Sequence, residues 1–113
     1  MTRVCYDRAG LLLRMEGHAQ AGPEGQDLVC AALSMLMMAL ERRMQERAEA
    51  ALPMISRGPG SFMIRCTPAP DAERLCRESF DTIAAGLAVL AENRPECVAF
   101  TLENGETDEE GYA

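Results

Sequence analysis

The chain has 113 residues, of which 48% are hydrophobic and 26% are charged, and its formal net charge at pH 7 is −7. These values are typical of one globular domain with a real core, and they exclude both a disordered chain and a pair of such domains. The longest apolar run is far shorter than the roughly 20 residues that span a bilayer, and the N-terminus lacks the apolar core of a signal peptide. We therefore expect a cytoplasmic protein that does not associate with membranes.

Most of the negative charge belongs to the C-terminus. Residues 103–113 form a predicted acidic tail that contains Glu103, Glu106, Asp108, Glu109 and Glu110. The remaining residues, 1–102, are nearly neutral and predict a single domain with no basic patch for direct nucleic-acid binding. We expect the tail to be a solvated end, with steering of a basic partner as the alternative.

The first predicted elements are two strands, over residues 4–6 and 11–16, that form a hairpin around a turn containing Asp7 and Gly10. His18 follows the second strand. Residues 19–26 contain Gly22, Pro23 and Gly25, which interrupt regular structure, and they predict a loop that shapes or covers a site.

A helix is predicted from about residue 27 to 49. Between residues 28 and 40 every side chain except Ser34 is apolar or a cysteine, so this half of the helix needs to be buried on all sides. A second copy of the chain would supply the missing cover, which predicts a homodimer with methionines at the contact. The alternative is packing within the chain, under the second helix.

Residues 54–57 and 62–67 flank a Gly-Pro-Gly turn and predict a second hairpin. A second helix is expected over residues 71–92, where an apolar stripe recurs at helical spacing (Cys76, Phe80, Ile83, Leu87 and Leu90), and a last strand over residues 97–102. The order ββαββαβ predicts an α/β (α+β) two-layer sandwich with two helices and about five mainly antiparallel strands.

The chain has five cysteines and one histidine, without a Cys-x-x-Cys pair. This pattern predicts reduced thiols rather than a disulfide scaffold, and it predicts neither a zinc site nor another metal or cofactor. The histidine, His18, is close in sequence to Cys30, and these two residue types form the nucleophile and base of a thiol hydrolase. A cysteine protease is therefore the leading hypothesis, although the spacing permits contact between the two side chains without requiring it.

If the helix begins near Asp27, Cys30 lies in its first turn, where unpaired backbone N–H groups favour a thiolate and can hold an oxyanion. Asp27 then has two possible roles, as the helix N-cap or as the residue that orients His18. Ser34 lies one turn beyond Cys30. Its simplest role is a hydroxyl bonded to the carbonyl of Cys30, and the alternative is a contact with substrate or histidine.

Residues 17–19, Gly25, residues 27–32 and Ser34 together resemble the signature of the ribosomal-processing cysteine protease Prp family. The resemblance implies a dimeric endopeptidase that removes the N-terminal extension of a large-subunit ribosomal protein, the one numbered twenty-seven. It implies Cys30 as nucleophile and His18 as general base, Asp27 and Ser34 as supporting residues, and a substrate loop that contains Gly22 and Gly25. Two alternatives stay open: a non-enzymatic ribosome-associated assembly factor and a thiol redox sensor.

Overall fold

The computed structural model of the protein describes residues 1–17 and 24–103, with the backbone alone for residues 24–27. The strands are β1 (Thr2–Asp7), β2 (Leu12–Glu16), β3 (Pro53–Gly58), β4 (Ser61–Cys66) and β5 (Val98–Glu103). The helices are α1 (Glu24–Gln45), the short α2 (Ala48–Ala51), the 3₁₀ turn η1 (Pro70–Ala72) and α3 (Glu73–Asn93). This order confirms the predicted α+β class.

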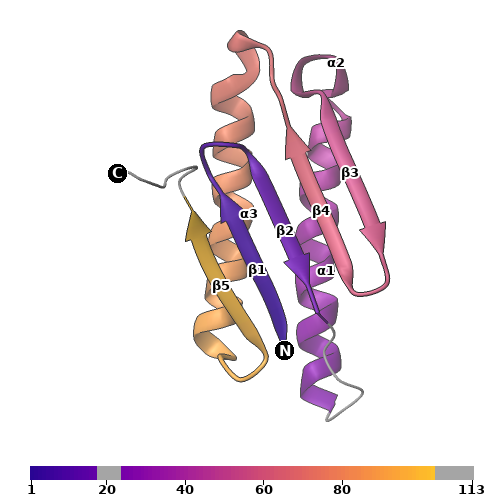
Figure 1. Ribbon diagram of the computed structural model, residues 1–113, viewed down its shortest axis with the longest axis vertical. Helices are drawn as coiled ribbons and strands as arrows, with labels where there is room; N and C mark the ends of the chain where they lie inside the picture. Colours follow the sequence, from indigo (N-terminus) through magenta and orange to yellow (C-terminus); the bar gives the residue numbers. More distant parts are fainter. Residues whose placement is uncertain (18–23, 104–113) are drawn as a thin grey trace.

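One five-stranded sheet has the order β3-β4-β2-β1-β5. Both hairpins and the β2–β4 pair are antiparallel, whereas β1 and β5 are parallel. Figure 1 shows α1 and α3 side by side on one face of the sheet, which confirms the two-layer, mainly antiparallel arrangement. Within the described part of the chain, no helix is both long and apolar enough to cross a membrane.

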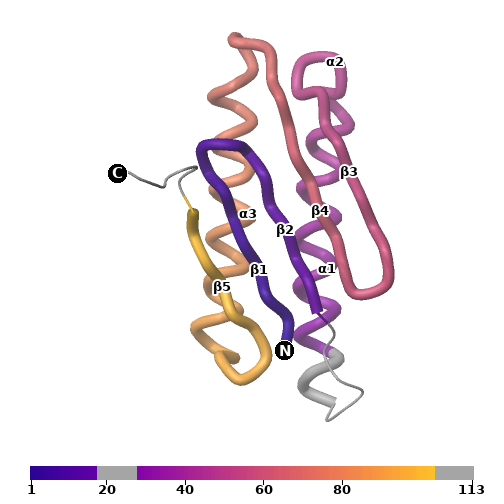
Figure 2. The backbone as a smooth tube through the Cα atoms, viewed as in Figure 1, coloured from indigo at the N-terminus to yellow at the C-terminus, as the bar shows by residue number. Residues whose placement is uncertain are grey.

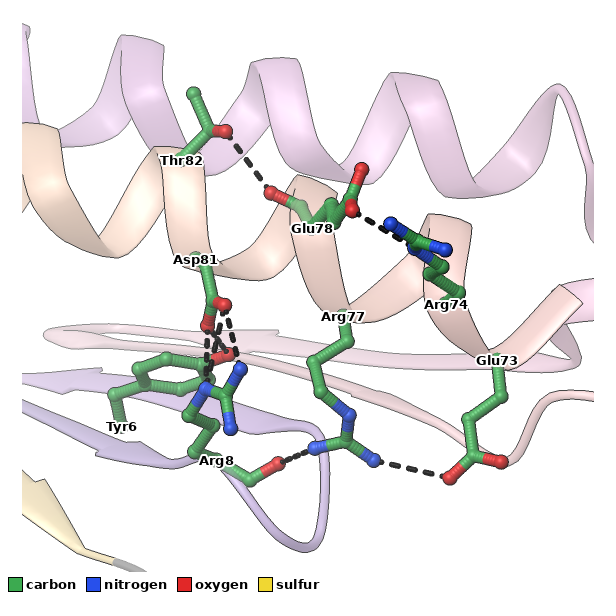
Figure 3. Close-up of polar contacts among 8 residues, drawn as sticks. All are labelled: Tyr6, Arg8, Glu73, Arg74, Arg77, Glu78, Asp81 and Thr82. Atoms are coloured by element: carbon green, nitrogen blue, oxygen red, sulfur yellow. Dashed lines mark hydrogen bonds and ion pairs between the residues drawn. The ribbon is translucent and has the colours of Figure 1, made fainter.

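The core lies between the sheet and the two long helices. The helix α3 contributes Cys76, Phe80 and Leu87 from the predicted stripe, all fully buried, while Ile83 and Leu90 pack at its margin. Polar contacts also connect α3 to β1 and to the first turn (Figure 3). The apolar stripe of this segment is therefore the face of α3 that packs on the sheet, as predicted.

Helix α1 is buried on one side only. Val29, Leu33, Met37, Leu40 and Met44 form a continuous buried stripe at helical spacing. On the other side the side chains of Leu28, Met35 and Met38 are 73%, 64% and 44% exposed. Packing within the chain therefore covers only part of the apolar half of this helix.

The bounds of the first helix differ from the prediction at both ends. Helix α1 begins at Glu24, three residues before Asp27, and ends at Gln45, after which α2 is a separate turn. The helix can begin at Glu24 because the first backbone N–H groups need no partner within the helix and an acidic residue in the first turn is favoured by the helix dipole. Leu52, in the left-handed conformation with φ 50°, ends α2 before β3.

The last strand ends one residue later than predicted, since Glu103 is the last residue of β5. The rest of the tail, residues 104–113, lies outside the described residues. At the other end of β5, the carbonyl of Cys97 accepts a 2.9 Å hydrogen bond from the backbone N–H of Thr2. The start of the first strand is thus bonded to the start of the last one.

Candidate active site

Cys30 is half-buried on α1 and lines an open hollow of about 340 Å³. Ser34 lies one helical turn further along and Met38 another turn beyond it, and both line the same hollow. A hollow of this size is at the lower end of the range of ligand sites. The structure therefore brings together two of the predicted site residues, Cys30 and Ser34, on one wall of a cavity.

The opposite wall comes from the β3–β4 hairpin, through Arg57, Gly58, Gly60, Ser61 and Phe62. The guanidinium carbon of Arg57 lies 4.5 Å from the centroid of the Phe62 ring, a cation–π arrangement. Arg57 also forms an ion pair with Glu41 of α1. These two contacts hold the Arg57 side chain between the hairpin and the helix.

Thr2, Met15 and Gly17 also line the hollow, at the start of β1 and the end of β2. Figure 2 shows these two strand ends side by side. Gly17, which follows β2, has φ +109°, and a Cβ at this position would lie 2.4 Å from the carbonyl oxygen of Met1. Its N–H donates a 2.8 Å hydrogen bond to the carbonyl of Gly60. Only glycine fits this position, and the chain is therefore held at the edge of the hollow immediately before His18.

The structure does not show the side-chain position of His18 or Asp27, and it gives only a partial test of Gly22 and Gly25. His18 and Gly22 lie outside the described residues, and for Asp27 the backbone alone is described. Gly25 is part of α1 rather than of a loop, so the prediction of a loop through residue 26 was wrong at its end. The reason is the early start of α1 at Glu24, since glycine is tolerated in a first helical turn.

The early start of α1 also corrects two expectations about its N-terminus. Asp27 is the fourth residue of the helix and cannot be its N-cap, because the cap precedes the first helical residue. Cys30 is the seventh residue of the helix and lies in its second turn, so its own N–H is not one of the unpaired amides at the helix start. The predicted first-turn position of the thiol was therefore wrong.

The hydroxyl of Ser34 does not bond to the carbonyl of Cys30, contrary to the simplest expectation. In α3, by contrast, Ser79 and Thr82 each donate a 2.9 Å hydrogen bond to the carbonyl four residues earlier. Among the described residues the Ser34 hydroxyl has no hydrogen-bond partner. It is therefore available to a group that enters the hollow.

All five cysteines are free thiols, but most of them are in unreactive surroundings. Burial and a hydrogen bond with Glu103 raise the pKa of Cys5 to about 11. Burial raises the pKa of Cys66 to about 12 and also raises that of Cys76. Cys97 is buried at the start of β5. Cys30 is the thiol of this chain that lines the hollow.

The sequence did not indicate the far wall of the site. Arg57 and Phe62 lie in a hairpin with no catalytic pattern, and Thr2 precedes the predicted first strand. These residues reach the hollow because β4 pairs with β2, which is not its neighbour in sequence. The one sequence feature that could have indicated this wall is the turn at residues 58–60, because its glycines leave space at the tip of the hairpin.

A cysteine that lines an open hollow in a two-layer α+β domain supplies the nucleophile that a thiol-dependent hydrolase needs, while the predicted base, His18, lies outside the described residues. Residues 2–99 match the family model described as cysteine protease Prp. The chain therefore belongs to the Prp family of cysteine proteases.

Solved structures have the same fold. The essential ribosomal processing protease Prp from S. aureus in complex with a substrate peptide is 21% identical, with a TM-score of 0.73 over 91% of this chain and 100% of that one. Its complex with a covalently linked product peptide is 22% identical, with a TM-score of 0.70 over 90% and 97% of the two chains. SMU.848 from Streptococcus mutans is 24% identical, with a TM-score of 0.68 over 91% and 92%. No curated protein sequence gives a significant match.

Proposed function

We propose that the protein is an endopeptidase of ribosome maturation, which removes the N-terminal extension of the large-subunit ribosomal protein numbered twenty-seven. The observation that carries the proposal is the position of Cys30, a thiol in an open hollow, in a chain of a cysteine protease family. The relative from S. aureus is described as a ribosomal processing protease and has been solved with a substrate peptide. We further propose that the protein acts in the cytoplasm.

In the proposed mechanism the sulfur of Cys30 attacks the carbonyl carbon of the scissile peptide bond. His18, as general base, takes the thiol proton and delivers it to the leaving amine as the C–N bond breaks, which leaves a thioester on Cys30. Water, deprotonated by His18, then attacks the thioester, releases the carboxylate product and restores the thiol. The S. aureus relative has been solved in complex with a covalently linked product peptide, which supports a covalent route.

Ser34 and Asp27 are proposed as supporting residues. Ser34 lines the hollow with a hydroxyl that has no partner among the described residues, so it is suited to a contact with substrate. Asp27 is not the N-cap of α1, and we propose instead that it orients the imidazole of His18. The residues around Gly22 and Gly25 are proposed to contact substrate on the α1 side.

The homodimer is also part of the proposal. Leu28, Met35 and Met38 form an exposed apolar strip on α1, and a solvent-facing strip of this kind is typical of an interaction surface. The flexible methionine side chains adapt to a partner surface. We propose that the partner is a second copy of this chain.

The test is incubation of the purified protein with the precursor of the ribosomal protein from the same organism, followed by mass spectrometry of the N-terminus. We expect wild-type protein to shorten the precursor with many turnovers, while Cys30→Ala leaves it intact. A protein that binds the precursor but leaves it intact at any ratio would be an assembly factor instead. Cleavage by Cys30→Ala at the wild-type rate would exclude Cys30 as the nucleophile.

A further inference from the structure

Thr2 is the first residue of β1 and lines the hollow that contains Cys30 and Ser34. It is 3% exposed, so its hydroxyl belongs to a buried side chain. Its backbone is fixed by the sheet, because its N–H bonds to the carbonyl of Cys97 and the residue pairs with Val98 of β5. Thr2 therefore lies at a rigid position on the wall of the candidate active site.

The hydroxyl of Thr2 has no hydrogen-bond partner within the described part of the chain. Buried polar groups in folded proteins are nearly always hydrogen-bonded, because a buried donor without an acceptor loses its hydration without compensation. Valine has almost the same shape as threonine and would avoid this cost. The presence of a hydroxyl here is therefore not explained by packing.

The conformation of Thr2 suits a binding role. A β-branched side chain has few accessible χ1 rotamers, so the hydroxyl loses little freedom when it binds a ligand. An unpaired hydroxyl hydrogen needs an acceptor, and the group that a peptide offers at every residue is its main-chain carbonyl. We propose that Thr2 is a substrate-binding residue, whose hydroxyl donates a hydrogen bond to a main-chain carbonyl oxygen of the peptide in the hollow. This inference rests on the proposed peptidase function.

The experiment compares Thr2→Val, which removes the hydroxyl and keeps the shape, with Thr2→Ser, which keeps the hydroxyl. Thr101→Val is the matched control, because Thr101 is exposed on β5 and does not line the hollow. Affinity tags are placed at the C-terminus, away from Thr2. Steady-state cleavage of a peptide spanning the N-terminal extension is measured, together with fluorescence anisotropy of the labelled peptide with each variant in a Cys30→Ala background.

We expect Thr2→Val to raise the Kd of the peptide about three- to tenfold, the effect of one hydrogen bond, and to lower kcat/KM at least as much. Thr2→Ser should retain most of the affinity, and Thr101→Val should match wild type. The Tm of Thr2→Val should equal or exceed that of wild type, because a buried hydroxyl without a partner is replaced by a methyl group. A clearly lower Tm would show a structural partner for the hydroxyl and overturn the inference.

The two proposals fail in different ways. If wild-type protein cleaves the peptide and Thr2→Val binds and cleaves it equally well, the inference about Thr2 is wrong and the peptidase function stands. If wild-type protein neither binds nor cleaves the peptide, the proposed function is wrong and the inference that rests on it is wrong with it.

Discussion

The phenol of Tyr6 on β1 donates a 2.6 Å hydrogen bond to Oδ1 of Asp81 on α3 (Figure 3). Arg8, at the start of the first turn, donates to both oxygens of the same carboxylate, with its Nη2 3.0 Å from Oδ2. Burial and the bond to Asp81 raise the pKa of Tyr6, so the phenol remains a donor at all ordinary pH values. This carboxylate connects the helix layer to β1, the strand whose first residue, Thr2, lines the hollow.

Replacement of Tyr6 by phenylalanine should lower the free energy of unfolding by about 1–2 kcal/mol, because a hydrogen bond to a charged acceptor is lost. Urea denaturation monitored by circular dichroism measures the change. Arg74→Met is a useful control, since Arg74 pairs with Glu78 on the exposed surface of the same helix and its loss should cost less than about 0.5 kcal/mol. Equal effects of the two variants would contradict the anchoring role of Tyr6.

The Asp81 carboxyl should make stability fall in acid. Burial raises its pKa, but the hydrogen bonds from Arg8 and Tyr6 outweigh that effect and hold it below the ordinary value of 3.8. The unfolded chain therefore takes up this proton first, so the stabilisation is present at neutral pH and is lost as the pH falls through and below about 4. Unfolding free energies measured from pH 7 to 2.5 should show a shallower decline for Asp81→Asn than for wild type.

Alkylation should distinguish Cys30 from the other thiols. With iodoacetamide at pH 7.5, peptide mapping by mass spectrometry should find Cys30 modified first. Cys66 and Cys76 should react only after unfolding, because they are buried, and the half-buried Cys5 should react more slowly than Cys30, because its pKa is raised. His18→Ala should slow the reaction of Cys30 below pH 8. Modification of Cys5 as fast as that of Cys30 would show that the hollow does not select the reactive thiol.

Gly17→Ala should be strongly destabilising. The new methyl group would lie 2.4 Å from the Met1 carbonyl oxygen, and φ is +109°, so both space and backbone conformation oppose it. A loss of about 2 kcal/mol or more in unfolding free energy is expected. Gly58→Ala is the matched control, because its nearest neighbour would be the mobile Ser61 side chain at 3.3 Å. A smaller loss at Gly17 than at Gly58 would be inconsistent with this geometry.

The proposed dimer is tested by Met35→Glu, which places a charge in the exposed strip of α1. Light scattering at micromolar concentration should give wild-type protein twice the chain mass of 12.3 kDa and give the variant a single chain mass. Val89→Glu, a similar change at an exposed apolar position on α3, should leave the mass unchanged. A monomeric wild-type protein would remove the basis of the proposal.

Local patterns in the sequence were sufficient for most of the fold. The turn around Asp7 and Gly10 was predicted from residue type, and in the structure the Asp7 side chain accepts a 3.1 Å hydrogen bond from the N–H of Gly10. The stripe from Cys76 to Leu87 predicted α3 because helical spacing is a property of the segment itself. The start of α1 was less certain, since proline and glycine are compatible with both a loop and a first helical turn.

The assembly of the site was beyond local patterns. The hollow needs β4 beside β2 and the tip of its hairpin near α1, and such a pairing depends on the whole core rather than on any segment. The role proposed for Thr2 could not be predicted from sequence either, because only the structure shows that its side chain is buried without a hydrogen-bond partner among the described residues. The motif around Cys30 therefore identified one wall of the site and not the other.

The pairing of β1 with β5 has a consequence for biosynthesis. Thr2 is synthesised 95 residues before its backbone partner, Cys97. A nascent chain that stops short of β5 leaves one edge of β1 unpaired, so the backbone of Thr2 is not yet fixed beside the hollow. Proteolytic competence should therefore arise late, once the final strand has emerged.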